Sequence, residues 1–171
     1  MADKCVICDI VQARIPSKKI YEDEEVIAVL DYNGANPGHS FIIPKDHFPI
    51  LEQVPANLVG KIFNVANKVS SAIFDTLKVE GTNIFVANGI PAGQKVAHFM
   101  VSVIPRKEGD GLNLNWQPRQ LSEEEMSTIE LKMKEEIGSI GLPQEPKPAQ
   151  QEVKHIFSEE NYLAKQLRRI P

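Results

Sequence analysis

The chain has 171 residues and a formal net charge of −4, with 42% hydrophobic and 25% charged residues. This composition is that of an ordinary globular protein and excludes fibrous and disordered classes, while the net negative charge argues against broad electrostatic binding to nucleic acid. No segment approaches the roughly 18 consecutive apolar residues that a membrane span needs. Asp3 and Lys4 precede any apolar run, so a signal peptide is not expected. We therefore expect a cytoplasmic protein with one well-packed core and no membrane partner.

Short strand patterns with turn signals between them recur along the first hundred residues. The predicted strands cover 20–23, 25–32, 39–44, 81–87 and 98–104, and a short helical turn is predicted at 10–13. Apolar residues recur at helical spacing from Pro55 to about Leu77, with Pro55 placed at the first helical position. One long helix among clustered strands predicts an α+β domain with a largely antiparallel sheet.

The last predicted strand carries the polar side chains that indicate a site. Read with a period of two, His98, Met100 and Ser102 share one face, whereas the residues between them are apolar and suited to a core. Pro105 is expected to end this strand because proline cannot donate to the sheet ladder. Upstream, Gly93-Gln94 predicts a turn whose backbone N–H groups would cradle an anion.

A second helix is predicted over 122–137. Ser122 and Glu125 form the pattern of a capping box at its start. Its apolar residues form a stripe that is expected to be buried, made of Met126, Ile129, Met133 and Ile137. The predicted organisation is a domain over 1–107, a helical region over 108–142 that packs on this domain, and a proline-rich linker with a short basic helical tail over 143–171.

The tail ends in a basic cluster, Lys165, Arg168 and Arg169. These cations suit the C-terminal end of a helix dipole, which favours a plain solvated face. The alternative is a docking element that contacts RNA or an acidic protein partner.

Cys5 and Cys8 are the two cysteines of the chain, and their spacing suits a metal site or a redox pair better than a structural disulfide. Zinc requires four ligands in a tetrahedron, and His47 and His98 each lie at an end of a predicted strand. If those strands are neighbours, the four residues are able to close a Cys2His2 site, which would be structural because no position is left for water. The alternative has His47 on the surface and His98 satisfied near the core.

Six motifs in this order and spacing resemble the histidine triad (HIT) family of nucleotide hydrolases and transferases, over roughly residues 1–107. They are Cys5-x-x-Cys8, Leu30-Asp31, Asn36-Pro37-Gly38-His39, Ile43-Pro44-Lys45-Asp46-His47, Ala92-Gly93-Gln94 and Val103-Ile104-Pro105-Arg106. The resemblance implies a HIT-like domain with a C-terminal helical extension, commonly a homodimer. It also implies a structural Zn²⁺ ion bound by Cys5, Cys8, His47 and His98.

The triad itself departs from the family pattern, His-x-His-x-His. His98 is kept, but Met100 stands where the family histidine attacks the α-phosphate, and Ser102 replaces the third histidine, which contacts the phosphate. A thioether has no basic nitrogen for such a cycle, and serine supplies no positive charge. Ala87 also falls where the family usually has an asparagine. We therefore predict a degenerate member without catalytic residues, because loss of a covalent nucleophile removes several orders of magnitude of turnover.

Other positions of the family's ligand site keep the family residue or carry a different polar residue. The resemblance implies that Asp31 holds the ribose hydroxyls, that Gly93-Gln94 keeps the anion turn, and that His39 and Ser102 lie near the phosphate. Lys95 follows this turn and would return positive charge to it. The alternatives are a strand-end turn for Asp31, a solvated loop lysine for Lys95, and a polar strand start for His39.

The functional prediction is a zinc-stabilised scaffold that binds a purine nucleotide or a macromolecular partner without hydrolysis. One alternative is a protein or RNA interaction module without nucleotide binding. Another is a HIT-like nucleotide hydrolase or transferase whose chemistry has moved to His39 or Ser102, with histidine as the base that serine would need.

Overall fold

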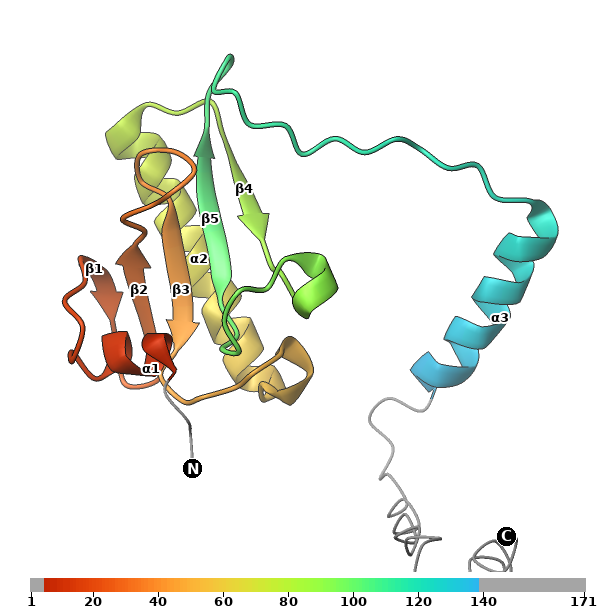
Figure 1. The fold of residues 1–171 in the computed structure, drawn as a ribbon, viewed down its shortest axis with the longest axis horizontal. Coiled ribbons are helices and arrows are strands. Elements are labelled where there is room, and N and C mark those ends of the chain that lie inside the picture. Colours follow the sequence, from red (N-terminus) through yellow and green to blue (C-terminus); the bar gives the residue numbers. More distant parts are fainter. Residues whose placement is uncertain (1–4, 139–171) are drawn as a thin grey trace, which may run out of the picture. The chain divides into compact units, whose positions relative to one another are not determined.

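A computed structural model of the chain describes residues 5–138 (Figure 1). The chain divides into two compact units, Met1–Asn115 and Trp116–Pro171. The first unit contains a five-stranded sheet with its helices, and the second contains helix α3 (Glu123–Gly138). Among the residues described, no helix combines the length and the apolar character needed to cross a lipid bilayer.

The strands of the first unit form one antiparallel sheet in the order β1-β2-β3-β5-β4 (Figure 1). The strands are β1 (Lys19–Glu22), β2 (Val26–Leu30), β3 (Ser40–Pro44), β4 (Gly81–Phe85) and β5 (Val101–Arg106). Branched side chains dominate β2, β3 and β5, as the pleated surface of a sheet favours. The predicted α+β fold with an antiparallel sheet is confirmed.

Helices lie on both faces of the sheet, with α2 (Ala56–Leu77) behind it and the short α1 (Val6–Val11) in front in Figure 1. Because strand side chains alternate between faces, β2 contributes to two separate cores. Val26 and Ala28 join the α2 core, whereas Ile27 and Val29 join a smaller core beneath α1. The smaller core also contains Cys5, Ile7 and Ile43.

Two details of the long helix and the last strand differ from the sequence prediction. Pro55 is the N-cap of α2 instead of its first helical residue. Pro105 lies inside β5, opposite Thr82 of β4, because the pairing between β3 and β5 stops at Ser40 and Val103. Pro105 therefore lies beyond the last pair that requires an N–H group on the β3 side, so proline costs no ladder hydrogen bond.

The start of β5 also differs from the prediction. The strand begins at Val101, so His98 and Met100 lie in the segment that leads into it. The alternation nevertheless continues through this segment, since Phe99 packs in the α2 core while Met100 packs against the core beneath α1.

In the second unit, α3 begins with the predicted capping box. The N–H of Glu125 donates to Oγ of Ser122 at 3.2 Å, and Oε2 of Glu125 accepts the N–H of Ser122 at 2.9 Å. Within the second unit the described residues bury no side chain of α3, and burial of its apolar stripe against another surface stays a prediction. The four side chains of the stripe are 44–57% exposed.

The proline-rich linker and the basic tail fall within 139–171, outside the described residues. The three-part organisation with boundaries at 107 and 142, and the packing of the helical region on the domain, stay predictions.

Candidate metal centre and the His39 face

The four predicted metal ligands come together at one end of the sheet. Cys5 is the N-cap of α1 and Cys8 lies one helical turn later, which places both sulfurs on the same side of the helix. His47 follows β3, and His98 precedes β5, the strand that pairs with β3. Their nitrogen and sulfur atoms all lie within 4.8 Å of one another.

The distances between these donor atoms match a tetrahedral ion. Nδ1 of His98 lies 3.6 Å from Sγ of Cys5 and 3.6 Å from Sγ of Cys8, and Nδ1 of His47 lies 3.3 Å from Sγ of Cys8. With zinc–sulfur and zinc–nitrogen bonds of usual length and tetrahedral angles, sulfur and nitrogen ligands are about 3.6 Å apart. The donor set therefore fits zinc, in both chemical type and spacing.

The tautomer of His98 also suits a metal. His98 is fully buried, and its Nε2–H donates to the carbonyl oxygen of Pro44 at 3.0 Å, which leaves the Nδ1 lone pair facing the sulfurs. Burial lowers the pKa of His98, so this imidazole is held neutral. Burial, and next the hydrogen bond with Cys5, raise the pKa of Cys8 to about 11. A bound divalent cation would reverse this shift by stabilising the thiolate.

Next to the cluster, on the same side of the sheet, lies a surface that we call the His39 face. It consists of Asp31, His39, Phe41, Met100 and Ser102. Phe41 is directly opposite Ser102 in the β3–β5 pairing, so the two side chains share a face. The N–H of Asp31 donates to the carbonyl of His39 at 2.9 Å, which extends the β2–β3 ladder by one pair.

The His39 side chain is held on this face by its neighbours. Its Nδ1 accepts the N–H of Ala35 at 3.1 Å and lies 3.7 Å from Oδ2 of Asp31, and its ring centroid is 4.9 Å from that of Phe41. The proton of the neutral ring must therefore be on Nε2. Among the residues described, this Nε2 is the one buried side-chain nitrogen or oxygen without a hydrogen-bond partner. Burial lowers the pKa of His39, and the Asp31 carboxylate opposes that shift in part.

Asp31 fits both of its sequence interpretations. Its Oδ1 accepts the N–H of Asn33 at 2.9 Å, which is the hydrogen bond of a turn-forming aspartate. Its side chain is also 22% exposed beside His39, so the carboxylate is still open to a ligand hydroxyl.

A hydrogen-bond network that the sequence did not predict holds the loop between Asp31 and His39. Nδ2 of Asn36 donates to the carbonyl of Pro105 at 2.7 Å and to Oδ2 of Asp110 at 3.0 Å. Arg106 in turn pairs with Asp110 through Nε at 2.6 Å and Nη2 at 2.9 Å. The four-residue spacing of Arg106 and Asp110 was visible in the sequence, but nothing local connects it to Asn36.

The Gly93-Gln94 turn is closed on itself. Gly93 has φ of 91°, as expected of a glycine turn. Its N–H donates to the carbonyl of Ile90 at 3.0 Å, and that of Gln94 donates to Gly89 at 3.2 Å. The side chain of Gln94 joins the turn to Pro49 through a 2.6 Å hydrogen bond from Nε2. Both backbone donors expected to face an anion are therefore engaged within the turn.

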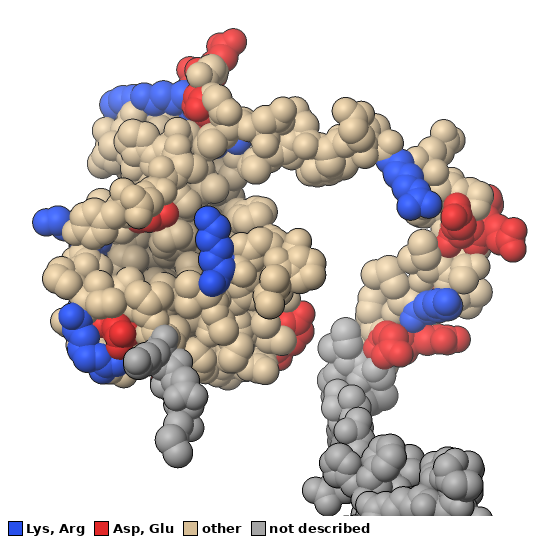
Figure 2. Space-filling view, in the orientation of Figure 1, with Lys and Arg blue, Asp and Glu red and all other residues tan. Residues whose placement is uncertain are grey.

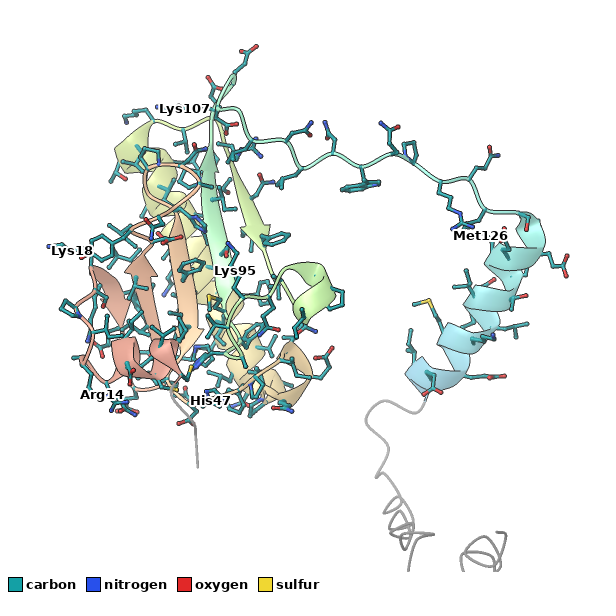
Figure 3. The ribbon with its side chains drawn as sticks, in the orientation of Figure 1. Arg14, Lys18, His47, Lys95, Lys107 and Met126 are labelled. Carbon is teal, nitrogen blue, oxygen red and sulfur yellow. The ribbon has the colours of Figure 1, made fainter. Side chains whose placement is uncertain are left out.

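Lys95 follows this turn and is exposed. Figure 3 shows its side chain in front of β5, on the same side of the sheet as α1. In Figure 2 most of the surface of the first unit is uncharged, and its acidic and basic side chains lie mainly toward the edges. His47 is labelled in Figure 3 near the lower end of the sheet, so the metal cluster and Lys95 lie at different places on one side of the molecule.

Residues 12–109, more than half of the chain, match the family model of the HIT domain. The chain belongs to the HIT family. The donor cluster and the His39 face both include residues of the segment that leads into and forms β5, namely His98 in the cluster and Met100 and Ser102 in the face.

Two curated relatives and one solved structure illustrate the similarity. Adenylylsulfatase HINT3 of Arabidopsis thaliana is 38% identical over 112 residues, which are 66% of this chain and 57% of that protein. Adenosine 5'-monophosphoramidase HNT1 of Candida albicans is 30% identical over 141 residues, covering 80% and 93%. A zinc-bound histidine triad family protein from Mycobacterium smegmatis has a TM-score of 0.62 and 31% identity, covering 80% and 96%. The chain thus spans little more than half of the Arabidopsis protein and nearly all of the other two.

Proposed function

We propose that this HIT-family protein is a zinc-stabilised scaffold that binds a purine nucleotide without hydrolysing it. The observation that carries the proposal is a contrast within one segment. His98 belongs to a donor cluster with the spacing of a zinc site, whereas Met100 and Ser102 stand where the family resemblance implies the attacking and the phosphate-contacting histidines.

Zinc would have a structural role at the cluster. Four protein ligands leave no open position for water or substrate, so the ion would supply stability and no catalysis. It would join α1, the loop after β3 and the segment before β5. The solved zinc-bound relative supports the choice of metal.

The His39 face is the proposed nucleotide site. Two relatives are named as enzymes of adenylyl sulfate and of adenosine 5'-monophosphoramide, which supports a purine nucleotide as ligand. The proposed contacts are Asp31 to the ribose hydroxyls, His39, Lys95 and Ser102 near the phosphate, and Gly93 and Gln94 through the shape of their closed turn.

Hydrolysis would be absent because Met100 offers no nitrogen to form a covalent nucleotidyl intermediate. Its thioether packs against the core beneath α1, so this position serves packing. Ser102 lies opposite Phe41, and no described hydrogen bond joins its hydroxyl to a base that would activate it.

Three measurements on the purified full chain test the proposal. We expect one zinc per chain by elemental mass spectrometry, saturable AMP binding by calorimetry, and no release of AMP from adenosine 5'-phosphoramidate or adenylyl sulfate above the buffer rate. Turnover at the rates of active relatives would contradict the proposal. Loss of that turnover in His39→Ala would favour an enzyme whose catalytic group has moved to His39. If the protein binds zinc but shows no binding of millimolar AMP, the result would instead favour an interaction module that binds protein or RNA.

A homodimer is a second proposal, supported by the exposed surface of β4. This edge strand pairs only with β5 and exposes Ile84 and Phe85 by 45% and 43%. Next to it, Ser70 of α2 contacts Thr82 of β4 through their hydroxyls at 2.8 Å. The same side of α2 carries exposed apolar residues at helical spacing, Phe63, Phe74 and Leu77. An unpaired edge with apolar neighbours is suited to pairing with a second copy.

Light scattering tests the dimer with matched charge insertions on the two edges of the sheet. We expect Ile84→Lys to give a monomer, because Ile84 shares with Thr82 the face of β4 that lies beside α2, so the charge enters this apolar surface. Ile20→Lys, on the opposite edge strand and of similar exposure at 46%, is expected to leave the dimer intact. The reverse result would place the interface at β1, and a monomeric parent protein would contradict the dimer.

A further inference from the structure

Two loops of the chain contain an asparagine followed by a glycine, Asn33-Gly34 after β2 and Asn88-Gly89 after β4. At such a pair the backbone nitrogen of glycine is able to attack the amide carbon of the asparagine side chain, because glycine has no side chain to hinder the approach. A carbon–nitrogen bond forms, ammonia leaves, and water then opens the resulting succinimide ring to aspartate or isoaspartate. The reaction requires a side chain that is free to turn toward the next backbone nitrogen.

Hydrogen bonds restrain both reacting groups at Asn88-Gly89. Oδ1 of Asn88 accepts the N–H of Leu51 at 2.9 Å, and Nδ2 of Asn88 donates to Oε1 of Glu52 at 2.8 Å. The attacking nitrogen is engaged as well, since the N–H of Gly89 donates to Oε1 of Gln94 at 2.8 Å. Ring closure at Asn88 must break these hydrogen bonds first, so it requires local opening of the structure.

The side chain of Asn33 has none of these restraints. Asn33 is exposed and its own N–H donates to Oδ1 of Asp31 at 2.9 Å, but within residues 5–138 its side-chain amide makes no hydrogen bond. No side chain of this range accepts the N–H of Gly34. Glycine is also required at this position, because a Cβ atom on Gly34 would lie 2.7 Å from Cβ of His39. Packing against His39 therefore keeps a glycine directly after an unrestrained asparagine.

We propose that Asn33 is a site of spontaneous deamidation in the folded protein and that Asn88 is protected from it. Aspartate at this position adds a negative charge two residues from Asp31, and isoaspartate also adds one carbon atom to the main chain. The change falls in the loop that is held by the N–H of Asp31 on the carbonyl of His39 at 2.9 Å and by the N–H of Ala35 on Nδ1 of His39 at 3.1 Å. Deamidation therefore alters the charge and the geometry beside His39 without an enzyme or a bound ligand.

Incubation of the full chain at mildly alkaline pH, followed by peptide mass spectrometry, tests this assignment. We expect deamidation in the folded protein to be at least about tenfold faster at Asn33 than at Asn88, because closure at Asn88 must first break hydrogen bonds. In urea the two sites should react at similar rates, since each is followed by glycine. Equal rates at the two sites of the folded protein would overturn the proposal. A rate at Asn33 that is about tenfold lower in the folded protein than in urea would also overturn it.

Three variants, each checked for folding by circular dichroism, connect the rates to the named groups. Asn33→Gln should abolish the fast reaction, because glutamine would have to close a larger ring, whereas the matched Asn88→Gln should keep the parent rate at Asn33. Glu52→Ala deletes the acceptor of Nδ2 of Asn88, so it should raise the rate at Asn88 and leave that at Asn33 unchanged. A fast reaction that persists in Asn33→Gln would overturn the site, and no rise at Asn88 in folded Glu52→Ala would contradict the protection assigned to its side-chain hydrogen bonds.

Discussion

At the scale of single residues, neighbouring positions before β5 have separate tasks. His98 is fully buried and directs Nδ1 to two sulfurs, while Met100 two positions later belongs to an apolar core. The same segment thus contributes to the donor cluster and to a packed core. Under the proposed function, a thioether at Met100 leaves the cluster undisturbed, because Met100 and His98 lie in different surroundings.

Restoring the missing imidazole is expected to return part of the chemistry. We predict that Met100→His raises the rate of AMP release from adenosine 5'-phosphoramidate about a hundredfold over the parent, because histidine supplies a nucleophilic nitrogen. Ser102 and Ala87 remain altered, so the rate stays below that of active relatives. Met100→Leu, which keeps the packing without a nitrogen, serves as the control. No gain in Met100→His with zinc still bound would show that loss of the nucleophile alone does not explain the inactivity.

The buried His39 is expected to make stability depend on pH. Burial lowers its pKa below the ordinary value of 6.5, so the unfolded chain binds this proton first as pH falls. The contribution of His39 to the free energy of unfolding is therefore fully present above pH 6.5 and decreases as pH falls below it. Urea unfolding at pH 7.5 and 5.5 should show a smaller loss of stability in His39→Gln than in the parent. An equal loss in both proteins would contradict this assignment.

At the scale of elements, short-range patterns decide where α3 begins and long-range pairing decides how β5 runs. The reciprocal hydrogen bonds of Ser122 and Glu125 lie three residues apart in the chain, so the sequence alone reveals them. Pro105 is different, because its place inside β5 depends on where the pairing with β3 stops.

Removing the cap should shorten α3 from its N-terminal end. Ser122→Ala deletes the oxygen that accepts the Glu125 N–H, and we expect a loss of about 1 kcal/mol of helix stability. Backbone chemical shifts of 123–138 measure the helix directly. Ser127→Ala, an exposed serine within the same helix, is the control and should preserve the helix. Equal shifts in the two variants would mean that the capping box is not formed in solution.

At the scale of the whole molecule, the cluster joins segments that are far apart in the sequence. Cys8 and His98 meet across 90 residues and Cys8 and His47 across 39. Closing such loops costs conformational entropy, and a metal that binds only the folded arrangement stabilises the fold by mass action. The zinc proposal therefore has a consequence for global stability.

Metal removal is expected to lower the melting temperature of the full chain. If free zinc stands at about a thousand times its Kd, the folded state gains about 4 kcal/mol, which corresponds to a shift of roughly 10 °C for a domain of this size. Differential scanning fluorimetry with and without a chelator measures it. Cys8→Ser should melt at the temperature of the chelator-treated parent, and its melting temperature should not change when chelator is added. A parent protein that melts at the same temperature under both conditions would contradict a structural zinc.

The amino-acid sequence by itself determined the features that depend on residues close together in the chain. The strands predicted at 25–32 and 39–44, the helical spacing before Leu77 and the capping box at Ser122 are of this kind, and all three are confirmed. The four residues of the donor cluster were also named from the sequence, through the spacing of the two cysteines and the resemblance to the HIT family.

Only the tertiary structure decided which partners those residues meet. It brings Asn36 to Asp110, closes the Gly93-Gln94 turn on its own carbonyls and leaves Nε2 of His39 without an acceptor in the described chain. The physical reason is that a hydrogen bond or a buried contact depends on the atoms nearest in space, and strand pairing sets these neighbours across tens of residues.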